Sequence, residues 1–287
     1  MRRIKSFEGN SILYVISTPI GNLKEFSTRA IEVLKSCDYI ASEDTRTTVS
    51  LLKQFSIAKP SISYHEHNEQ EASEKIINLL KEGKTIGLTS DAGYPGISDP
   101  GSILIKHCIE NDIPVSIVNG SNAFIPALVG SGLDTTHFYF HGFLSSKGSA
   151  RKKELMELVE KKETMIFYES PHRIKETLID MREILGNRQI SIAREITKLH
   201  EEYIRGTLEE ILNIEESTLR GEMVVVVEGN KEIKLLLEQD IINIIEDELK
   251  EGLSLKDAVK KVSEDYSLKK NYVYQLATKI KAVKKTE

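Results

Sequence analysis

The 287-residue sequence has no tryptophan and two cysteines, and no apolar run approaches the roughly 20 residues that a membrane-spanning helix needs. No apolar stretch of signal-peptide length follows the basic start, residues 1–5. Cys37 and Cys108 belong to no CxxC motif and no Cys/His cluster, so we expect buried thiols instead of a disulfide or a metal site. With 40% hydrophobic and 29% charged residues, these absences predict a soluble, cytoplasmic, globular protein.

Two nucleotide-binding signatures are also missing. The glycine-containing loop Thr18–Leu23 follows the first apolar run, but it has neither GxGxxG nor the GK[ST] of a phosphate loop. This disfavours dinucleotide and triphosphate binding. The loop either holds a polar ligand group or only connects a strand to a helix.

The 44 acidic residues outnumber the 39 basic ones, and the charge is unevenly distributed. The net charge of −5 argues against a general nucleic-acid binder, yet residues 250–287 carry +5 and residues 1–249 carry −10. A basic C-terminal appendage on an acidic body suits contact with phosphates, whereas the alternative is a solvated lysine-rich tail. Of Tyr272 and Tyr274, we expect one in the core, although either could stack on bases.

Short β-type runs alternate with helical patterns in the first half, which predicts a parallel α/β sheet. The expected strands are residues 13–16, 38–41, 85–88 and 115–118, with helices capped by Ser27 and over residues 71–80 and 102–108. The second half predicts a mixed sheet. It has a helix at 123–129 and strands at 138–141, 164–168, 190–193, 203–206 and 223–227, the last two pairing with each other.

The pattern turns helical from residue 233, with an apolar stripe that includes Leu235, Leu236, Ile241 and Ile245. We therefore predict an α/β fold with two α/β domains, residues 1–118 and 119–231, and a small all-helical domain, residues 232–287. No linker-like stretch marks the first boundary, and the one near Asn230 is clearer.

The run Ser90–Gly101 is the most informative segment, because three glycines, two prolines and two aspartates in twelve residues suit neither helix nor strand. It lies between a strand-like and a helix-like stretch. Loops at the carboxyl ends of strands are where open α/β sheets bind ligands, so we expect a binding loop. The alternative is an elaborate surface turn.

Three other polar segments also follow apolar strands: residues 42–46, 167–173 and 193–198. Each has a structural alternative, such as a helix cap at Ser42 or Asp44. Together with the two loops they predict a composite active site. Residues 64–69 hold two histidines and two acids, but no further His/Cys pair with metal spacing follows, so we predict a polar loop and no metal.

Taken in order, segments 13–23, 42–46, 90–101, 167–173 and 193–198 resemble the ribosomal RNA small subunit methyltransferase I family. That family belongs to the tetrapyrrole-methylase-like (class III) S-adenosylmethionine methyltransferases. The resemblance runs from about residue 11 to Gly229, and residues 253–281 resemble the family's helix-turn-helix-like C-terminal domain. It implies two α/β domains with S-adenosylmethionine in the cleft between them, 2′-O-methylation of a cytidine ribose in 16S ribosomal RNA of the small subunit, and a homodimer.

The resemblance also implies which residues contact the cofactor. The loop at 90–93 would hold its methionine part, although Ser-Asp-Ala-Gly replaces the Gly-Gly-Asp-Pro of related enzymes. The expected cofactor residues are Pro19, Ser90, Asp91, Ala92, Gly93, Pro95, Ile97, Ser121, Asn122, Ala123, Glu169 and Ile196.

A neutral ribose hydroxyl is a poor nucleophile, so methyl transfer needs a base or a strong hydrogen-bond acceptor. We expect Asp44 or Glu43 in this role with Glu195 behind them, while Arg46 positions phosphate or ribose. The expected substrate contacts are Arg173, Arg194, Lys198, Lys269 and Lys270.

Two rival interpretations are a methyltransferase of a small molecule, such as a tetrapyrrole precursor, and a non-catalytic RNA-binding factor. The basic tail and residues 42–46 argue against the first, and the loop at 90–101 argues against the second.

Overall fold

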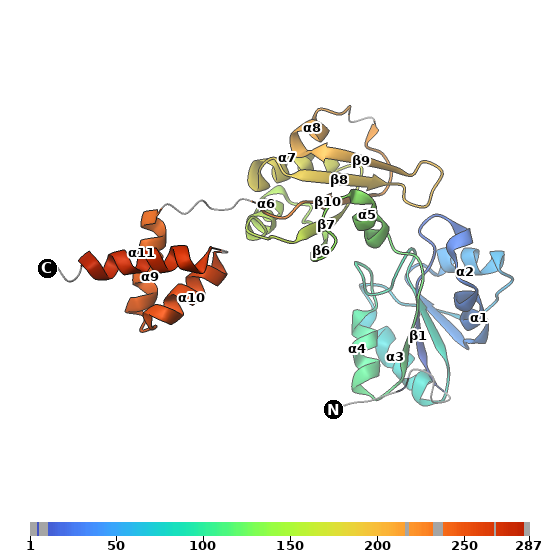
Figure 1. The fold of residues 1–287 in the computed structure, drawn as a ribbon. Coiled ribbons are helices and arrows are strands. Elements are labelled where there is room, and N and C mark those ends of the chain that lie inside the picture. The colour runs from blue at the N-terminus through green and yellow to red at the C-terminus, as the bar shows by residue number, and fades with distance from the viewer. Residues whose placement is uncertain (1–4, 6–10, 216–217, 232–237, 267, 284–287) are drawn as a thin grey trace. The chain divides into compact units, whose positions relative to one another are not determined.

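The structure is a computed structural model that describes residue 5 and residues 11–215, 218–231, 238–266 and 268–283, with 279–283 described by backbone alone. The chain forms two compact units, which divide between Asn230 and Lys231. The first unit contains two five-stranded sheets, and the described helices of the second are α9, α10 and α11 (Figure 1).

The first sheet confirms the predicted parallel arrangement. Its strands are β1 (Leu13–Ile16), β2 (Tyr39–Ser42), β3 (Ser61–Ser63), β4 (Ile86–Thr89) and β5 (Val115–Val118). Their order is β3-β2-β4-β1-β5, and every pair is parallel. The sequence analysis missed β3, because its pattern is a single buried isoleucine between two exposed serines.

Helices cover both faces of this sheet. They are the short 3₁₀ turn η1 (Leu23–Glu25), α1 (Thr28–Ser36), α2 (Thr45–Gln54), α3 (Glu69–Lys81) and α4 (Ser102–Glu110). Alternation along β1 sends Leu13 into a core with α3 and α4, and Ile16 into a core with α1 and α2. Cys37 and Cys108 are buried in these two cores, as predicted.

The second half is built around a mixed sheet, as predicted. Its elements are α5 (Phe124–Ser131), β6 (Phe138–Phe143), α6 (Gly148–Glu157), β7 (Thr164–Glu169), α7 (Ile174–Leu185), β8 (Gln189–Arg194), β9 (Glu202–Thr207), α8 (Leu208–Leu212) and β10 (Met223–Val227). The strand order is β6-β7-β10-β8-β9, with only β6 and β7 parallel.

The predicted pairing of residues 203–206 with 223–227 is wrong, because β8 lies between β9 and β10. All five residues of β10 are buried and apolar, so this strand takes the centre of the sheet. Strand β9 is half-exposed and takes the edge. Burial on both faces therefore overrides closeness in sequence.

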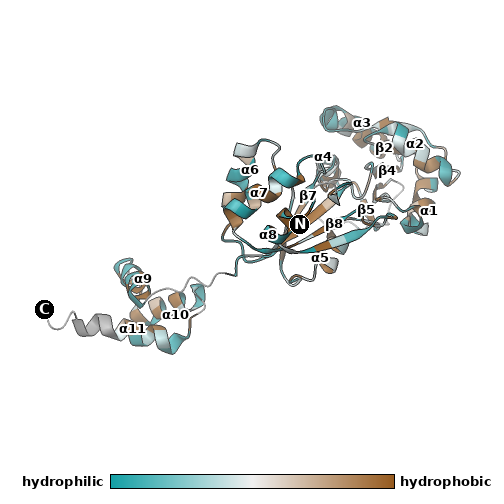
Figure 2. Ribbon diagram, turned by 90° about the horizontal axis from the view of Figure 1, so that it is seen from above, coloured by the Kyte–Doolittle hydropathy of each residue, from teal (hydrophilic) through white to brown (hydrophobic). Residues whose placement is uncertain are grey.

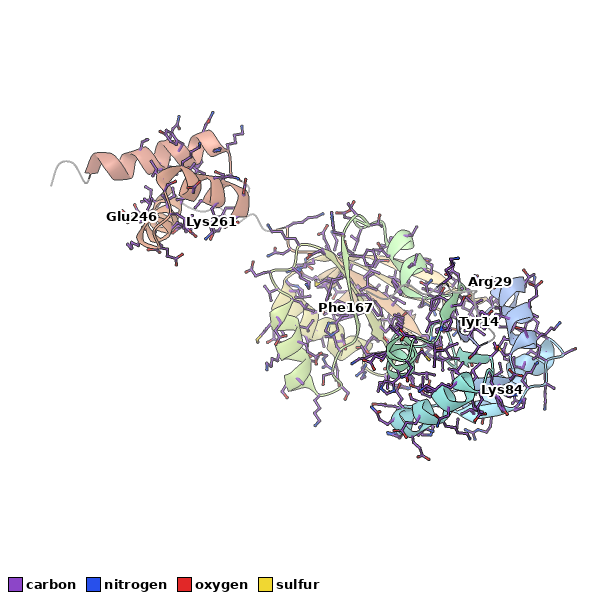
Figure 3. The ribbon with its side chains drawn as sticks, turned by 90° about the horizontal axis from the view of Figure 1, so that it is seen from below. Tyr14, Arg29, Lys84, Phe167, Glu246 and Lys261 are labelled. Atoms are coloured by element: carbon purple, nitrogen blue, oxygen red, sulfur yellow. The ribbon has the colours of Figure 1, made fainter. Side chains whose placement is uncertain are left out.

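The second sheet separates two apolar layers. Phe167 lies in the layer beneath α6, α7 and α8, and Figure 3 shows it inside this part of the chain. Ile166 and Ala193 face the opposite way and pack against α5. The hydropathy colouring shows apolar residues concentrated on the strands β7 and β8 (Figure 2).

The C-terminal unit contains α9 (Glu238–Lys250), α10 (Leu255–Asp265) and α11 (Lys270–Val283). Ile241 and Ile245 of the predicted stripe pack against Val259 and other apolar residues of α10 and α11, whereas 235 and 236 lie outside the described residues. An ion pair of 2.7 Å joins Lys261, labelled in Figure 3, to Glu248. Across the described ranges, no helix combines the length and apolar character needed to cross a membrane.

Candidate active site

The loops after β1 and β4 meet at one edge of the first sheet, because the two strands are parallel neighbours. Thr18 and Gly93 exchange two backbone hydrogen bonds, of 2.9 and 3.1 Å. The hydroxyl of Thr18 also donates to the carbonyl of Ser90 over 3.1 Å. These bonds make the two loops a single rigid platform.

The loop Ser90–Gly101 depends on glycine for its path. Gly93 and Gly101 have φ values of +78° and +143°, which disfavour residues with side chains. A Cβ on Gly101 would lie 3.0 Å from the backbone nitrogen of Gly96, so the loop also packs tightly on itself. Ser98, which is not a glycine, has φ of +61° beside the site.

The histidine-rich segment braces this loop. Glu69 accepts the backbone N–H of Gly101 over 3.0 Å, and Tyr64 donates to the same carboxylate oxygen of Glu69. The Tyr64 hydroxyl also accepts the N–H of Leu104 in the first turn of α4. In the described part of the chain, no group of three or more His, Cys, Asp or Glu side chains is placed to hold a metal ion.

A cavity of about 300 Å³ lies between the loops of the first sheet and the strand ends of the second. Its walls include seven of the predicted cofactor residues: Ala92, Gly93, Ile97, Asn122, Ala123, Glu169 and Ile196. The other lining residues, which sequence reasoning did not assign, are Ile20, Tyr94, Ser98, Asp99, Phe143, Tyr168, Ser170, Pro171, Glu222, Met223 and Val224. The cavity is therefore mostly apolar, with a few acidic groups.

A second, wider hollow of about 660 Å³ lies on the other side of the loop at 90–93. Pro19, Ser90 and Asp91 line this hollow, together with Asp44 and Arg46. The structure therefore divides the predicted residues between two neighbouring spaces. Two predicted cofactor residues line neither space. The carbonyl of Ser121 accepts a hydrogen bond from the hydroxyl of Ser17, and Pro95 is buried beside Gly101.

Asp44 caps α2 by accepting the N–H of Arg46 over 2.8 Å. A helix cap was the structural alternative that the sequence analysis gave for residues 42–46. Its carboxylate also pairs with the Arg46 guanidinium through contacts of 3.1 and 2.7 Å. These hydrogen bonds to Arg46 lower the pKa of Asp44 to about 2. A carboxylate with so little affinity for a proton is a weak base.

Glu43 and Asp99 have the opposite character. Burial, followed by the charge of Asp91, raises the pKa of Glu43. Burial is also the main cause that raises the pKa of Asp99 to about 7, with Glu43 and Asp91 adding to it. Asp99 was not assigned from the sequence, although its place in the loop Ser90–Gly101 was a usable signal.

Directly after β8, Glu195 is held by Lys198 over 3.0 Å and by the backbone N–H of Glu222 over 3.0 Å. The hydrogen bond with Lys198 is the main reason that the pKa of Glu195 is lowered. Lys198 also pairs with the side chain of Glu222, and Arg194 pairs with Glu202.

Glu169 is almost wholly buried, and its carboxylate is fully engaged. It accepts hydrogen bonds from the backbone of Ser170 at 2.8 Å and from Thr177 at 2.6 Å, and it pairs with Arg173 at 2.8 Å. Glu169 thus forms part of the cavity wall at the end of β7, and Arg173 is its ion-pair partner.

Comparison with known proteins places the chain in a family. The sequence model of the tetrapyrrole (corrin/porphyrin) methylases matches residues 12–212. The chain is 44% identical to ribosomal RNA small subunit methyltransferase I of Bacillus subtilis, over 96% of this chain and 97% of that protein. It is 46% identical to the protein of that name from Halalkalibacterium halodurans, over 92% and 93% of the two chains.

The chain belongs to the ribosomal RNA small subunit methyltransferase I family, within the tetrapyrrole methylases.

Solved structures agree on the fold of this methylase. The methyltransferase CobJ superposes with a TM-score of 0.57 at 17% identity, over 77% of this chain and 95% of that one. Cobalt precorrin-4 methyltransferase gives a TM-score of 0.55 at 14% identity, over 76% and 95%. The expected two-sheet methylase fold is thereby confirmed.

The C-terminal unit presents the last predicted substrate residues of this methylase. Lys269 and Lys270 are exposed at the start of α11. Tyr272 and Tyr274 are 36% and 53% exposed, so the expectation that one of them lies in the core is wrong. Val273 takes that place, because it points into the cluster formed by α9 and α10.

Proposed function

We propose that this chain transfers a methyl group from S-adenosylmethionine to the 2′-oxygen of a cytidine ribose in 16S ribosomal RNA of the small subunit. The observation that carries the proposal is the extent of the similarity. Relatives named as ribosomal RNA methyltransferases match over 92–96% of this chain, whereas the tetrapyrrole methylases of known structure match over 76–77%. The longer match takes in the basic C-terminal unit, which a small substrate does not require.

The cavity fits S-adenosylmethionine chemically. Its volume of about 300 Å³ is at the lower end of the roughly 300–1,000 Å³ typical of small-molecule sites. The apolar side chains of Ile20, Ile97 and Met223 suit a nucleoside and the aliphatic part of a methionine. Gly93 lets the main chain approach a ligand closely.

S-adenosylmethionine supplies a methyl group that its sulfonium charge has already activated, so the protein contributes mainly alignment. We infer that Ala92, Gly93 and Ile196 hold the cofactor and that the apolar walls keep water from it. The neighbouring hollow would take the ribose and an adjacent phosphate. The Arg46 side chain, 89% exposed there and oriented by Asp44, would contact that phosphate.

Methyl transfer to defined acceptors tests the proposal. Small subunits lacking the modification, naked 16S RNA and tetrapyrrole precursors are each incubated with the chain and radiolabelled S-adenosylmethionine. We expect label on a single cytidine ribose of the RNA. Label on the tetrapyrrole precursor alone would establish the small-molecule rival, and cofactor binding without any transfer would contradict both.

The family resemblance also implies a homodimer, and the cysteine usage predicts a cytoplasmic location; both stay predictions. Light scattering of the full chain in solution measures the mass directly. A mass equal to 32.4 kDa, that of one chain, would contradict the dimer.

A further inference from the structure

Asp99 combines a place in the cavity with acidic surroundings. It lines the cavity, and its electrostatic neighbours in the described part of the chain are the carboxylates of Glu43 and Asp91. Asp91 in turn lines the neighbouring hollow. Asp99 therefore lies in the cavity proposed for the cofactor, and the ribose hydroxyl must reach this cavity to attack the methyl group.

The backbone around Asp99 is held on both sides. Gly101 donates to Glu69, and the carbonyl of Pro100 accepts the N–H of Gly96 over 3.1 Å. On the other side, Ser98 lies against Gly142 in the bulge of β6, where a Cβ on Gly142 would come within 3.1 Å of the serine oxygen. A carboxylate on so rigid a loop is positioned before any ligand binds.

The groups that face Asp99 favour its protonated form. Glu43 comes from the loop after β2, Asp91 from its own loop, and Tyr168 from β7 across the cavity. The Tyr168 phenol has its own pKa raised to about 12, mainly by burial and then by the charge of Asp99, so it stays neutral. Lys198, in the loop after β8, is paired with Glu195 and Glu222.

We propose that Asp99 is the catalytic residue that accepts the 2′-hydroxyl proton of the ribose during methyl transfer, an inference that rests on the proposed function. The O–H bond breaks and its proton passes to a carboxylate oxygen of Asp99. The new O–CH₃ bond forms as the C–S bond breaks with its electron pair going to sulfur. The proton on Asp99 then leaves to solvent when product departs.

The other candidate acceptors are less suited to this step. Asp44 is paired with Arg46, and Glu195 is paired with Lys198, so cations already compensate both charges. Glu43 is not among the residues that line the cavity. Its place near Asp99 makes it a positioning residue, whose negative charge keeps the proton affinity of Asp99 high.

The test compares Asp99→Asn, Glu43→Gln and a control, Glu110→Gln, which removes an exposed carboxylate at the end of α4. Calorimetry measures the Kd of S-adenosylmethionine and of S-adenosylhomocysteine, which lacks the sulfonium charge. Single-turnover methyl transfer to small subunits is measured from pH 5 to 9. Circular dichroism checks that each variant is folded.

In the wild type we expect the pH–rate profile to have a rising limb, whose midpoint lies at or below about pH 7 because the cationic cofactor favours the charged carboxylate of Asp99. Asp99→Asn should lose this limb and about 100-fold in rate, with both Kd values changed less than about threefold. Glu43→Gln should move the limb to lower pH while keeping the plateau, and Glu110→Gln should match the wild type.

Three results would overturn the inference. Asp99→Asn could retain the wild-type rate and limb. Its affinity for S-adenosylmethionine could instead fall more than about tenfold, with the affinity for S-adenosylhomocysteine unchanged and the limb retained. That result would make Asp99 a binder of the sulfonium. A wild type that binds cofactor but methylates no ribosomal RNA would overturn the proposed function, and this inference with it.

Discussion

The backbone N–H of Asp44 donates a hydrogen bond of 3.2 Å to a carboxylate oxygen of Asp91. This bond joins the loop after β2 to the loop after β4. It holds the first turn of α2, which contains Arg46, against the loop at 90–93, which separates the cavity from the neighbouring hollow. The two spaces are thus held in a fixed relation by one side chain.

Removing that link should slow methyl transfer. Asp91→Ala is expected to lower kcat/KM for the RNA acceptor about tenfold, the equivalent of one hydrogen bond of about 1.4 kcal/mol. Asp91→Asn keeps an oxygen that can accept the Asp44 N–H, so it should stay within about threefold of the wild type. Steady-state transfer measures both, and equal losses in the two variants would show that charge matters instead of the bond.

The raised pKa of Asp99 should make folding stability depend on pH. Between its unfolded value of 3.8 and about 7, the folded state binds more protons, so stability falls as pH rises through this window. Asp99→Asn removes this pH dependence. The free energy of unfolding of the variant, relative to the wild type, should therefore be about 1–3 kcal/mol higher at pH 8 than at pH 5. Urea unfolding without cofactor measures this, and an identical difference from wild type at both pH values would contradict the prediction.

Glu169 should be a key residue for stability. Glu169→Ala removes the buried partner of Arg173, Ser170 and Thr177, which is expected to cost about 3 kcal/mol and to weaken cofactor binding. Thr177→Val removes a single one of these bonds and should cost about 1–2 kcal/mol. Chemical unfolding and calorimetry measure the two effects, and an unfolding midpoint unchanged by Glu169→Ala would refute the role.

Gly229 should not tolerate a side chain. A Cβ there would lie 2.0 Å from the carbonyl oxygen of Lys162, a backbone atom that cannot move aside. Gly229→Ala should therefore destabilise the first unit by about 3 kcal/mol or more. The control is Gly148→Ala at the start of α6, where the nearest atom is 3.8 Å away and stability should be unchanged or slightly higher. Thermal unfolding compares them, and equal melting temperatures would contradict the packing argument.

Lys269 and Lys270 should contribute to RNA affinity through phosphate contacts. The double change Lys269→Gln and Lys270→Gln is expected to weaken binding and to reduce the slope of log affinity against log salt by up to about 2. Lys250→Gln is the matched control, because Lys250 pairs with Asp247 at 2.8 Å. Filter binding over a range of KCl concentrations measures the slopes, and an unchanged slope in the double variant would support a solvated tail.

Local rules predicted most elements of the fold. The strand pattern of β1, the Ser27 cap and the glycine-rich loop all depend on near neighbours in sequence, so they could be read directly. The missed strand β3 has one buried residue, and the wrong pairing of β9 came from assuming that strands close in sequence are adjacent. Strand order depends on which segment is buried on both faces, and that is a property of the whole sheet.

The sequence by itself determined the alternation of strands and helices, the loop Ser90–Gly101 with its glycines at positive φ, and the basic C-terminal segment, because these follow from backbone preferences and composition. The tertiary structure alone decided the chemistry of Asp99. Asp44 and Asp99 are the same side chain, yet an arginine two residues away lowers one pKa to about 2, while burial beside Glu43 and Asp91 raises the other to about 7. Proton affinity depends on solvent exposure and on nearby charges, and for Asp99 these come from segments that only the fold brings together.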